Sequence, residues 1–122
     1  MAYCDALSLS GRDDWHLATN SELRSLIRGC PATETGGSCG VGDSCLGCAC
    51  WNDACDGCGY LGGPGADGVY WPPELGSAVA GDWSSSPTWS AFYAWYVCFC
   101  NGYVGNGDKT SAGDVRCVRP GP

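Results

Sequence analysis

The residues of this 122-residue chain most capable of chemistry are its 11 cysteines. Two Cys-x-x-Cys pairs, Cys45 with Cys48 and Cys55 with Cys58, lie close together, and Cys50 stands between them. A Cys-x-x-Cys turn presents two thiolates to one metal ion, so this pattern alone indicates a zinc or iron–sulfur site. The pairs are closer together than in a zinc ribbon, however, and no histidine or apolar shell accompanies them. We therefore favour disulfides here and keep a metal-thiolate protein as the alternative function.

Cys98 and Cys100 form a second set, within the run from Ala94 to Cys100. In an extended strand, residues two apart have Cα atoms about 6.5 Å apart and parallel Cβ bonds, which is poor geometry for a disulfide. We therefore expect each of them to pair with a cysteine of the segment 30–60, which would fold over the outer face of this strand. These two cysteines are also the only candidates for enzyme chemistry on a sheet, and His16 is the only histidine. We expect no enzyme and no catalytic residue.

The composition restricts the partners and the compartment. Cysteine makes up about 9% of the chain, a level typical of disulfide-rich proteins from oxidising compartments, so we expect an extracellular or cell-surface protein. The odd number of cysteines leaves at least one sulfur free, which allows self-association through that cysteine. With 13 acidic and 6 basic residues the net charge is -7, which argues against nucleic acid and anionic membranes as partners.

Neither a membrane span nor a resident cofactor is expected. No apolar run approaches the roughly 18 residues that a membrane-spanning helix needs. Apart from the thiolate-bound metals of the alternative function, calcium is a candidate ion whose ligands would come from Asp43, Asp53, Asp56 and Asp67, but their spacing does not resemble an EF-hand loop.

The elements that position these residues begin with a hairpin. Asn101-Gly102 separates two β-prone runs, which predicts a two-residue turn with Cys100 opposite Tyr103 and Phe99 opposite Val104. Strand alternation then divides the side chains between two faces. The face expected in the core holds Trp95, Val97, Phe99 and Val104, and the half-exposed outer face holds Tyr96, Cys98, Cys100 and Tyr103.

One helix is predicted with a clear start. Thr19 and Glu22 form a capping box, Leu23, Leu26 and Ile27 form an apolar stripe, and Gly29-Cys30-Pro31 ends the helix. Residues 3–9 suggest one or two further helical turns. The segment 30–58 has no apolar periodicity, so covalent bonds must hold it in place.

Both ends of the chain carry motifs of a known family. These are Asp14-Trp15-His16-Leu17-Ala18-Thr19, then Trp83-Ser84-Ser85-Ser86, and finally Val115-Arg116-Cys117-Val118-Arg119. In these motifs the chain resembles the Legionella collagen-like protein C-terminal domain family, outside the insert 30–60. The family usually has Arg and Pro where this chain has His16 and Ala18.

The resemblance implies an α+β fold of the C-type lectin-like type, near the formylglycine-generating-enzyme variant, with a small twisted antiparallel sheet and one or two short helices. It implies a single domain over 1–122 with a disulfide-stapled insert at 30–60, a C-terminal hairpin and binding region at 82–119, and a disulfide between Cys4 and Cys117.

The resemblance also implies function. Members of the family are bacterial extracellular or cell-surface modules that bind protein or carbohydrate ligands, and similar domains serve as variable proteins of diversity-generating retroelements. In such proteins the ligand-binding residues lie on the outer hairpin face and in the loop before it. Here these positions are Thr88, Trp89, Phe92, Tyr93, Tyr96, Cys98, Cys100 and Tyr103.

Overall fold

The computed structural model describes residues 15–45, 50–75, 81–88, 90, 92–108, 114–115 and 117–118, without the side chains of 114 and 115. Its elements are β1 (His16–Leu17), α1 (Asn20–Arg24), the 3-10 turns η1 (Asp53–Asp56), η2 (Ala66–Gly68) and η3 (Pro73–Leu75), β2 (Gly81–Trp83), β3 (Tyr93–Cys98), β4 (Tyr103–Asp108), β5 (Asp114–Val115) and β6 (Cys117–Val118). This mixture of small sheets with one short α-helix confirms the predicted α+β class. No helix in the described part is long and apolar enough to span a membrane.

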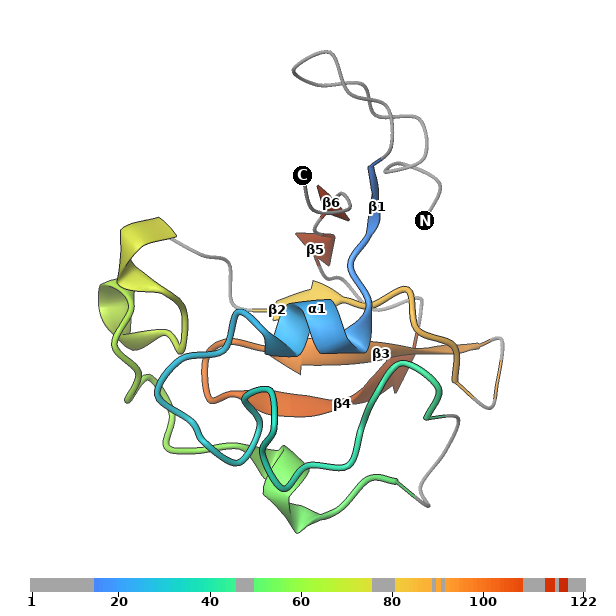
Figure 1. Ribbon diagram of the computed structural model, residues 1–122, viewed down its shortest axis with the longest axis horizontal. Helices are drawn as coiled ribbons and strands as arrows, with labels where there is room; N and C mark the ends of the chain where they lie inside the picture. Colours follow the sequence, from blue (N-terminus) through green and yellow to red (C-terminus); the bar gives the residue numbers. More distant parts are fainter. Residues whose placement is uncertain are drawn as a thin grey trace.

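The main sheet has the strand order β4-β3-β2-β5 (Figure 1). Strands β4, β3 and β2 are antiparallel to their neighbours, whereas β5 runs parallel to β2. The predicted antiparallel sheet is therefore found in three of its four strands. A second, two-stranded sheet pairs β1 with β6 and brings His16 opposite Val118. This pairing joins the two ends of the chain that the family motifs mark.

The β3–β4 hairpin has a longer turn than the sequence predicted. Cys98, not Cys100, lies opposite Tyr103, so four residues form the loop. Gly102 has φ of 77°, but Asn101 does not adopt positive φ; its side-chain oxygen instead accepts a hydrogen bond from the Tyr103 amide at 3.0 Å. The Gly102 amide closes the loop on the Cys98 carbonyl at 2.8 Å. A two-residue turn needs positive φ at both positions, which explains why this prediction was wrong.

The predicted division into two faces is nevertheless confirmed for the residues within the strands, because a register shift of two residues leaves each of their side chains on its original face. Phe99 and Cys100 lie in the loop, and Cys98, which was predicted to be half-exposed, is buried. All four side chains of the predicted core face, Trp95, Val97, Phe99 and Val104, are fully buried. They pack with Leu23 and Ile27 of the α1 region and with Val69, Tyr70 and Trp71, and the rings of Trp71 and Phe99 meet edge to face at 5.0 Å.

Helix α1 begins as predicted but ends early. Thr19 caps it with the reciprocal Thr19–Glu22 capping box. The last α-helical residue is Arg24, and the chain then tightens through hydrogen bonds from Leu26 to Leu23 and from Ile27 to Arg24. Such i→i+3 bonds still bring Leu23 and Ile27 to the core, so the apolar stripe was a correct signal for burial but not for helix length.

The insert lies along β4, the edge strand of the main sheet, and not over the outer face of the hairpin as predicted (Figure 1). The Trp51 indole donates to the Val104 carbonyl at 2.8 Å, and the Cys58 amide donates to the Asn101 carbonyl at 2.6 Å. An open strand edge exposes unpaired backbone groups to other chains, so the insert protects β4.

Disulfides and one arginine hold the insert together. Its described cysteines pair with one another, as Cys30–Cys58, Cys39–Cys55 and Cys45–Cys50. The buried guanidinium of Arg24 donates to the backbone carbonyls of Thr33 at 2.7 Å, Glu34 at 3.0 Å and Val41 at 2.9 Å. The insert therefore has the covalent support that the sequence required, together with a polar anchor that the sequence did not reveal.

The remaining disulfides involve Cys98, Cys100 and Cys117. Cys98 and Cys100 are bonded to each other, with Cα atoms 5.3 Å apart, which corrects their predicted pairing with the insert. Strand β3 ends at Cys98, so Cys100 lies in the turn and the strand geometry that forbids an i, i+2 bridge does not apply. Cys117 is also disulfide-bonded, and its predicted partner Cys4 lies outside the described residues.

Candidate binding surface at the two ends of the hairpin

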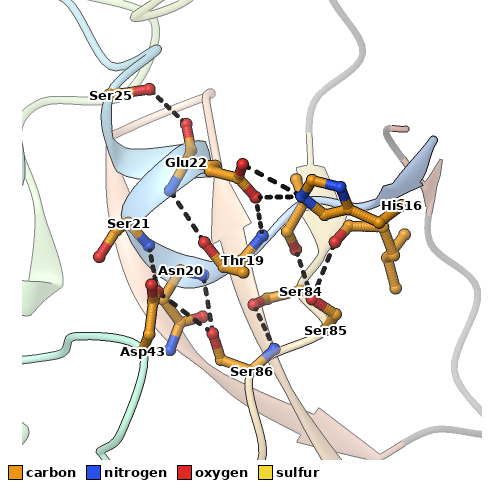
Figure 2. Close-up of polar contacts among 12 residues, drawn as sticks. His16, Thr19, Asn20, Ser21, Glu22, Ser25, Asp43, Ser84, Ser85 and Ser86 are labelled. Carbon is orange, nitrogen blue, oxygen red and sulfur yellow. Dashed lines mark hydrogen bonds and ion pairs between the residues drawn. The ribbon is translucent and has the colours of Figure 1, made fainter. Parts of the chain in front are cut away.

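A polar junction fixes the chain where β2 leads toward β3 (Figure 2). The Ser85 hydroxyl donates to the Leu17 carbonyl at 2.8 Å, and the Ser86 hydroxyl accepts from the Asn20 amide at 2.9 Å. Asp43 of the insert accepts from the Ser21 amide at 2.8 Å and lies 3.4 Å from the Ser86 hydroxyl. The serine motif is therefore a structural joint between β1, α1, the insert and the loop that follows β2.

The first end of the hairpin is formed by this loop and the start of β3. Phe92 is 77% exposed and Tyr93 is 39% exposed. The Thr88 hydroxyl lies 2.7 Å from the Ser90 carbonyl oxygen and 2.9 Å from that of Tyr93, and the Tyr93 amide donates to the Ser90 carbonyl at 3.3 Å. Thr88 thus orders the loop that presents the two aromatic rings.

The middle of the outer face is a layer of aromatic rings on small residues. Trp83 lies opposite Tyr96 in the register, and their ring centroids are 5.2 Å apart. The Tyr96 ring covers Gly81, where a Cβ atom would collide with it, and the edge of the Trp83 ring approaches Gly107. Trp83 is buried and Tyr96 is half-buried, so this part of the face is mainly packed.

The second end is the hairpin tip, about 17 Å from Tyr93 along β3. Tyr103 lies across Gly105, and burial, together with the nearby charge of Asp56, raises its pKa above the ordinary value. Beside it, the Leu61 amide donates to the Cys100 carbonyl at 2.7 Å. Tyr60 is 76% exposed and Leu61 is 40% exposed.

The structure therefore separates the predicted site residues. Thr88, Phe92 and Tyr93 lie at the first end, whereas Cys98, Cys100 and Tyr103 lie at the tip. Tyr93 shares a face with Trp95 and not with Tyr96, because residues two apart on a strand point to the same side. Trp89 lies outside the described residues.

Three residues of this surface were absent from the predicted set: the buried Trp83, which packs against Tyr96, and the exposed Tyr60 and Leu61. Trp83 is placed by its register opposite Tyr96, which required knowing that β2 neighbours β3. Tyr60 and Leu61 follow the insert in a glycine-rich passage, where no periodicity distinguishes an exposed side chain from a buried one.

The cysteines and the acidic residues do not form an ion site in the described part of the chain. Every described cysteine of the insert is in a disulfide, so none supplies the thiolate that zinc or iron requires. No three described Asp, Glu, His or Cys side chains come close enough to hold a metal ion. Asp43, the first of the four candidate calcium ligands, instead caps α1 through Ser21.

A comparison of the sequence with models of known families shows to which family this chain belongs. The family model described as the Lcl C-terminal domain matches residues 1–119. The chain belongs to the Lcl C-terminal domain family. No curated protein and no solved structure matches it. The disulfides of this Lcl C-terminal domain are consistent with an extracellular module, because such bonds form and persist in oxidising compartments.

Proposed function

We propose that this Lcl C-terminal domain is an extracellular ligand-binding module that recognises a protein or a glycan and performs no catalysis. The observation that carries the proposal is the exposure of Phe92 and Tyr93 at the first end of the hairpin. Exposure of large aromatic side chains to water is unfavourable, and at binding surfaces such side chains supply rigid apolar contact area.

The support beneath these two rings favours recognition. Trp95, fully buried directly beyond Tyr93 and Ala94, donates its indole N–H within 2.9 Å of the Pro87 carbonyl and 3.0 Å of the Cys45 carbonyl. These contacts join the loop to the core and to the insert. A surface that is ordered before binding loses less conformational entropy when a ligand arrives.

The charge of the chain limits the ligand. At a net charge of -7 the domain repels polyanions, so we propose an uncharged glycan or a neutral or basic protein surface in preference to a sulfated polysaccharide. For a sugar ligand, the expected contact is stacking of a pyranose ring on Phe92 or Tyr93.

Two finer assignments belong to the same proposal. The C-type lectin-like fold agrees with the pairing of β1 with β6, which joins the two ends of the described chain. A role as a variable protein of a diversity-generating retroelement stays a prediction. Among the described positions, Phe92 and Tyr93 have the exposure that a randomised position needs, whereas Cys98 and Cys100 are fixed by their disulfide.

A cell-binding assay tests this function. The fluorescently labelled domain, with its disulfides intact, is added to cultured mammalian and bacterial cells before and after the cells are treated with protease or with glycosidases. Saturable binding that one treatment removes supports the proposal and shows whether the ligand is protein or glycan. Absence of saturable binding to every cell type contradicts it.

A further inference from the structure

We propose that the hairpin tip is a second recognition site, which docks a basic, partly apolar segment of another protein. This inference rests on the proposed binding function and adds a site and a partner class. The tip surface consists of Tyr60, Leu61, Cys100 and Tyr103, flanked by Asp56 and Asp67.

The three backbone segments that carry these residues lie side by side. The backbone of residues 57–61 runs beside the turn, with the Cys58 amide on the Asn101 carbonyl and the Leu61 amide on the Cys100 carbonyl. Asp56 is close enough for its charge to act on Tyr103. Gly68, next to Asp67, packs so closely against Leu61 that a Cβ atom at Gly68 would collide with the Leu61 carbonyl.

The apolar part of the tip surface is held outward by its backbone. Leu61 has φ of 53°, a left-handed conformation that is rare for an apolar residue and costs free energy. The hydrogen bond from the Leu61 amide to the Cys100 carbonyl and the close contact with Gly68 maintain this conformation. The result is a leucine that is 40% exposed next to a tyrosine that is 76% exposed, with no contribution to the buried core.

The charge around the tip has one sign. Between positions 29 and 108 the sequence has no Lys or Arg, and its acidic residues there are Glu34, Asp43, Asp53, Asp56, Asp67, Glu74, Asp82 and Asp108. The described part of the chain has two guanidinium groups: that of Arg24 is buried against backbone carbonyls, and that of Arg28 donates to the carbonyls of Ser25 and Ile27. No described cation of the chain therefore neutralises Asp56 and Asp67, which are both exposed.

This combination of groups selects the occupant. An arginine or lysine of the partner can lie over the exposed Tyr60 ring while a carboxylate pairs with its charge. An apolar neighbour in the same segment can cover Leu61. A second copy of this chain is the poorer occupant, because its own net charge of -7 opposes association with an acidic surface.

In the test, a short peptide of alternating Arg and Leu residues is titrated into the oxidised domain. Binding is measured from the changes in the backbone amide chemical shifts of the domain. A peptide with Glu in place of Arg is the charge control. Two variants probe the tip surface: Leu61→Asn, which tolerates the left-handed backbone, and the isosteric double variant Asp56→Asn/Asp67→Asn. Leu75→Asn is the matched control, because Leu75 is 54% exposed and lies in η3 outside the tip surface.

We expect the Arg-Leu peptide to shift the resonances of residues 57–61 and 98–103, and each tip variant to weaken its binding about threefold or more, while Leu75→Asn changes it by less than about twofold. The Glu-Leu peptide should not bind. The proposal is overturned if the peptide does not bind, if the shifts map elsewhere, or if Leu75→Asn weakens binding as much as Leu61→Asn. Cell binding that persists when the peptide fails would leave the proposed function intact and remove only the tip site.

Discussion

Cys98 and Cys100 are joined by a disulfide at the tip of the β3–β4 hairpin, with their Cα atoms 5.3 Å apart. Because this bond closes a very short loop, the chain-entropy model assigns it about 1.5 kcal/mol, against about 3.5 kcal/mol for Cys30–Cys58 with its sequence separation of 28. We predict that Cys98→Ser/Cys100→Ser lowers the free energy of unfolding less than Cys30→Ser/Cys58→Ser does. Chemical denaturation of the two double variants measures this order, and the reverse order would contradict it.

The disulfide pairing itself is the second prediction. Peptide mapping of the non-reduced protein should recover Cys30–Cys58, Cys39–Cys55, Cys45–Cys50 and Cys98–Cys100, with Cys117 also bonded. Since the chain has 11 cysteines, one alkylatable or intermolecular sulfur should remain. Several free thiols together with bound zinc or iron would instead revive the metal-thiolate alternative.

Arg24 supplies the third prediction. Replacing it by Met removes three hydrogen bonds and takes the side-chain donor from the carbonyls of Thr33 and Val41, whereas the Glu34 carbonyl keeps its bond from the Gly37 amide. We expect the free energy of unfolding to fall by about 3 kcal/mol or more, with faster hydrogen exchange in the insert. Arg28→Met is the control, because Arg28 is exposed and its guanidinium donates to the nearby carbonyls of Ser25 and Ile27, so loss of this side chain should cost at most about 0.5 kcal/mol. Equal losses in both variants would show that Arg24 does not anchor the insert.

Asp43 gives a pH-dependent prediction. Partial burial raises its pKa, but hydrogen bonds from the Ser21 backbone and from the side chains of Ser21, Thr19 and Ser86 outweigh that effect and lower the pKa below the ordinary value. A carboxyl group whose pKa is lowered by folding stabilises the protein above its unfolded pKa of about 3.9, and this contribution is lost as the pH falls through the folded value.

We therefore expect Asp43→Asn to be less stable than the native protein at neutral pH, with the difference closing below about pH 4. Denaturant unfolding at a series of pH values measures the difference. A difference that stays constant through the acid range would show that the charge of Asp43 does not stabilise the fold.

The sequence predicted those parts of the fold that depend on local chemistry. The capping box of Thr19 and Glu22 located the start of α1, and strand alternation assigned Trp95, Val97, Phe99 and Val104 to the core. Both signals come from neighbouring residues, and they survive even when the register of the hairpin shifts by two positions.

The parts that failed depend on distant contacts. The residues near Arg24 in the sequence do not show that its guanidinium binds carbonyls of the insert instead of water. Likewise, the residues near Leu61 do not show that contacts with Cys100 and Gly68 hold its backbone in the left-handed conformation. The sequence placed the candidate ligand-binding residues on the outer hairpin face and in the loop before it, but it did not show that β3 separates the two groups by its full length. The sequence included Phe92 and Tyr93, which the structure exposes, among its candidate residues, whereas the exposure of Tyr60 and Leu61 is seen only in the fold.

The central claim is that the exposed rings at the first end of the hairpin bind the ligand. The most direct measurement compares saturable cell binding of the native domain with that of Phe92→Ala/Tyr93→Ala, using Leu75→Ala as an exposed apolar control and circular dichroism to verify folding. Loss of two ring contacts should weaken binding at least about tenfold, while the control stays within about twofold. Unchanged binding by the folded double variant would contradict the account.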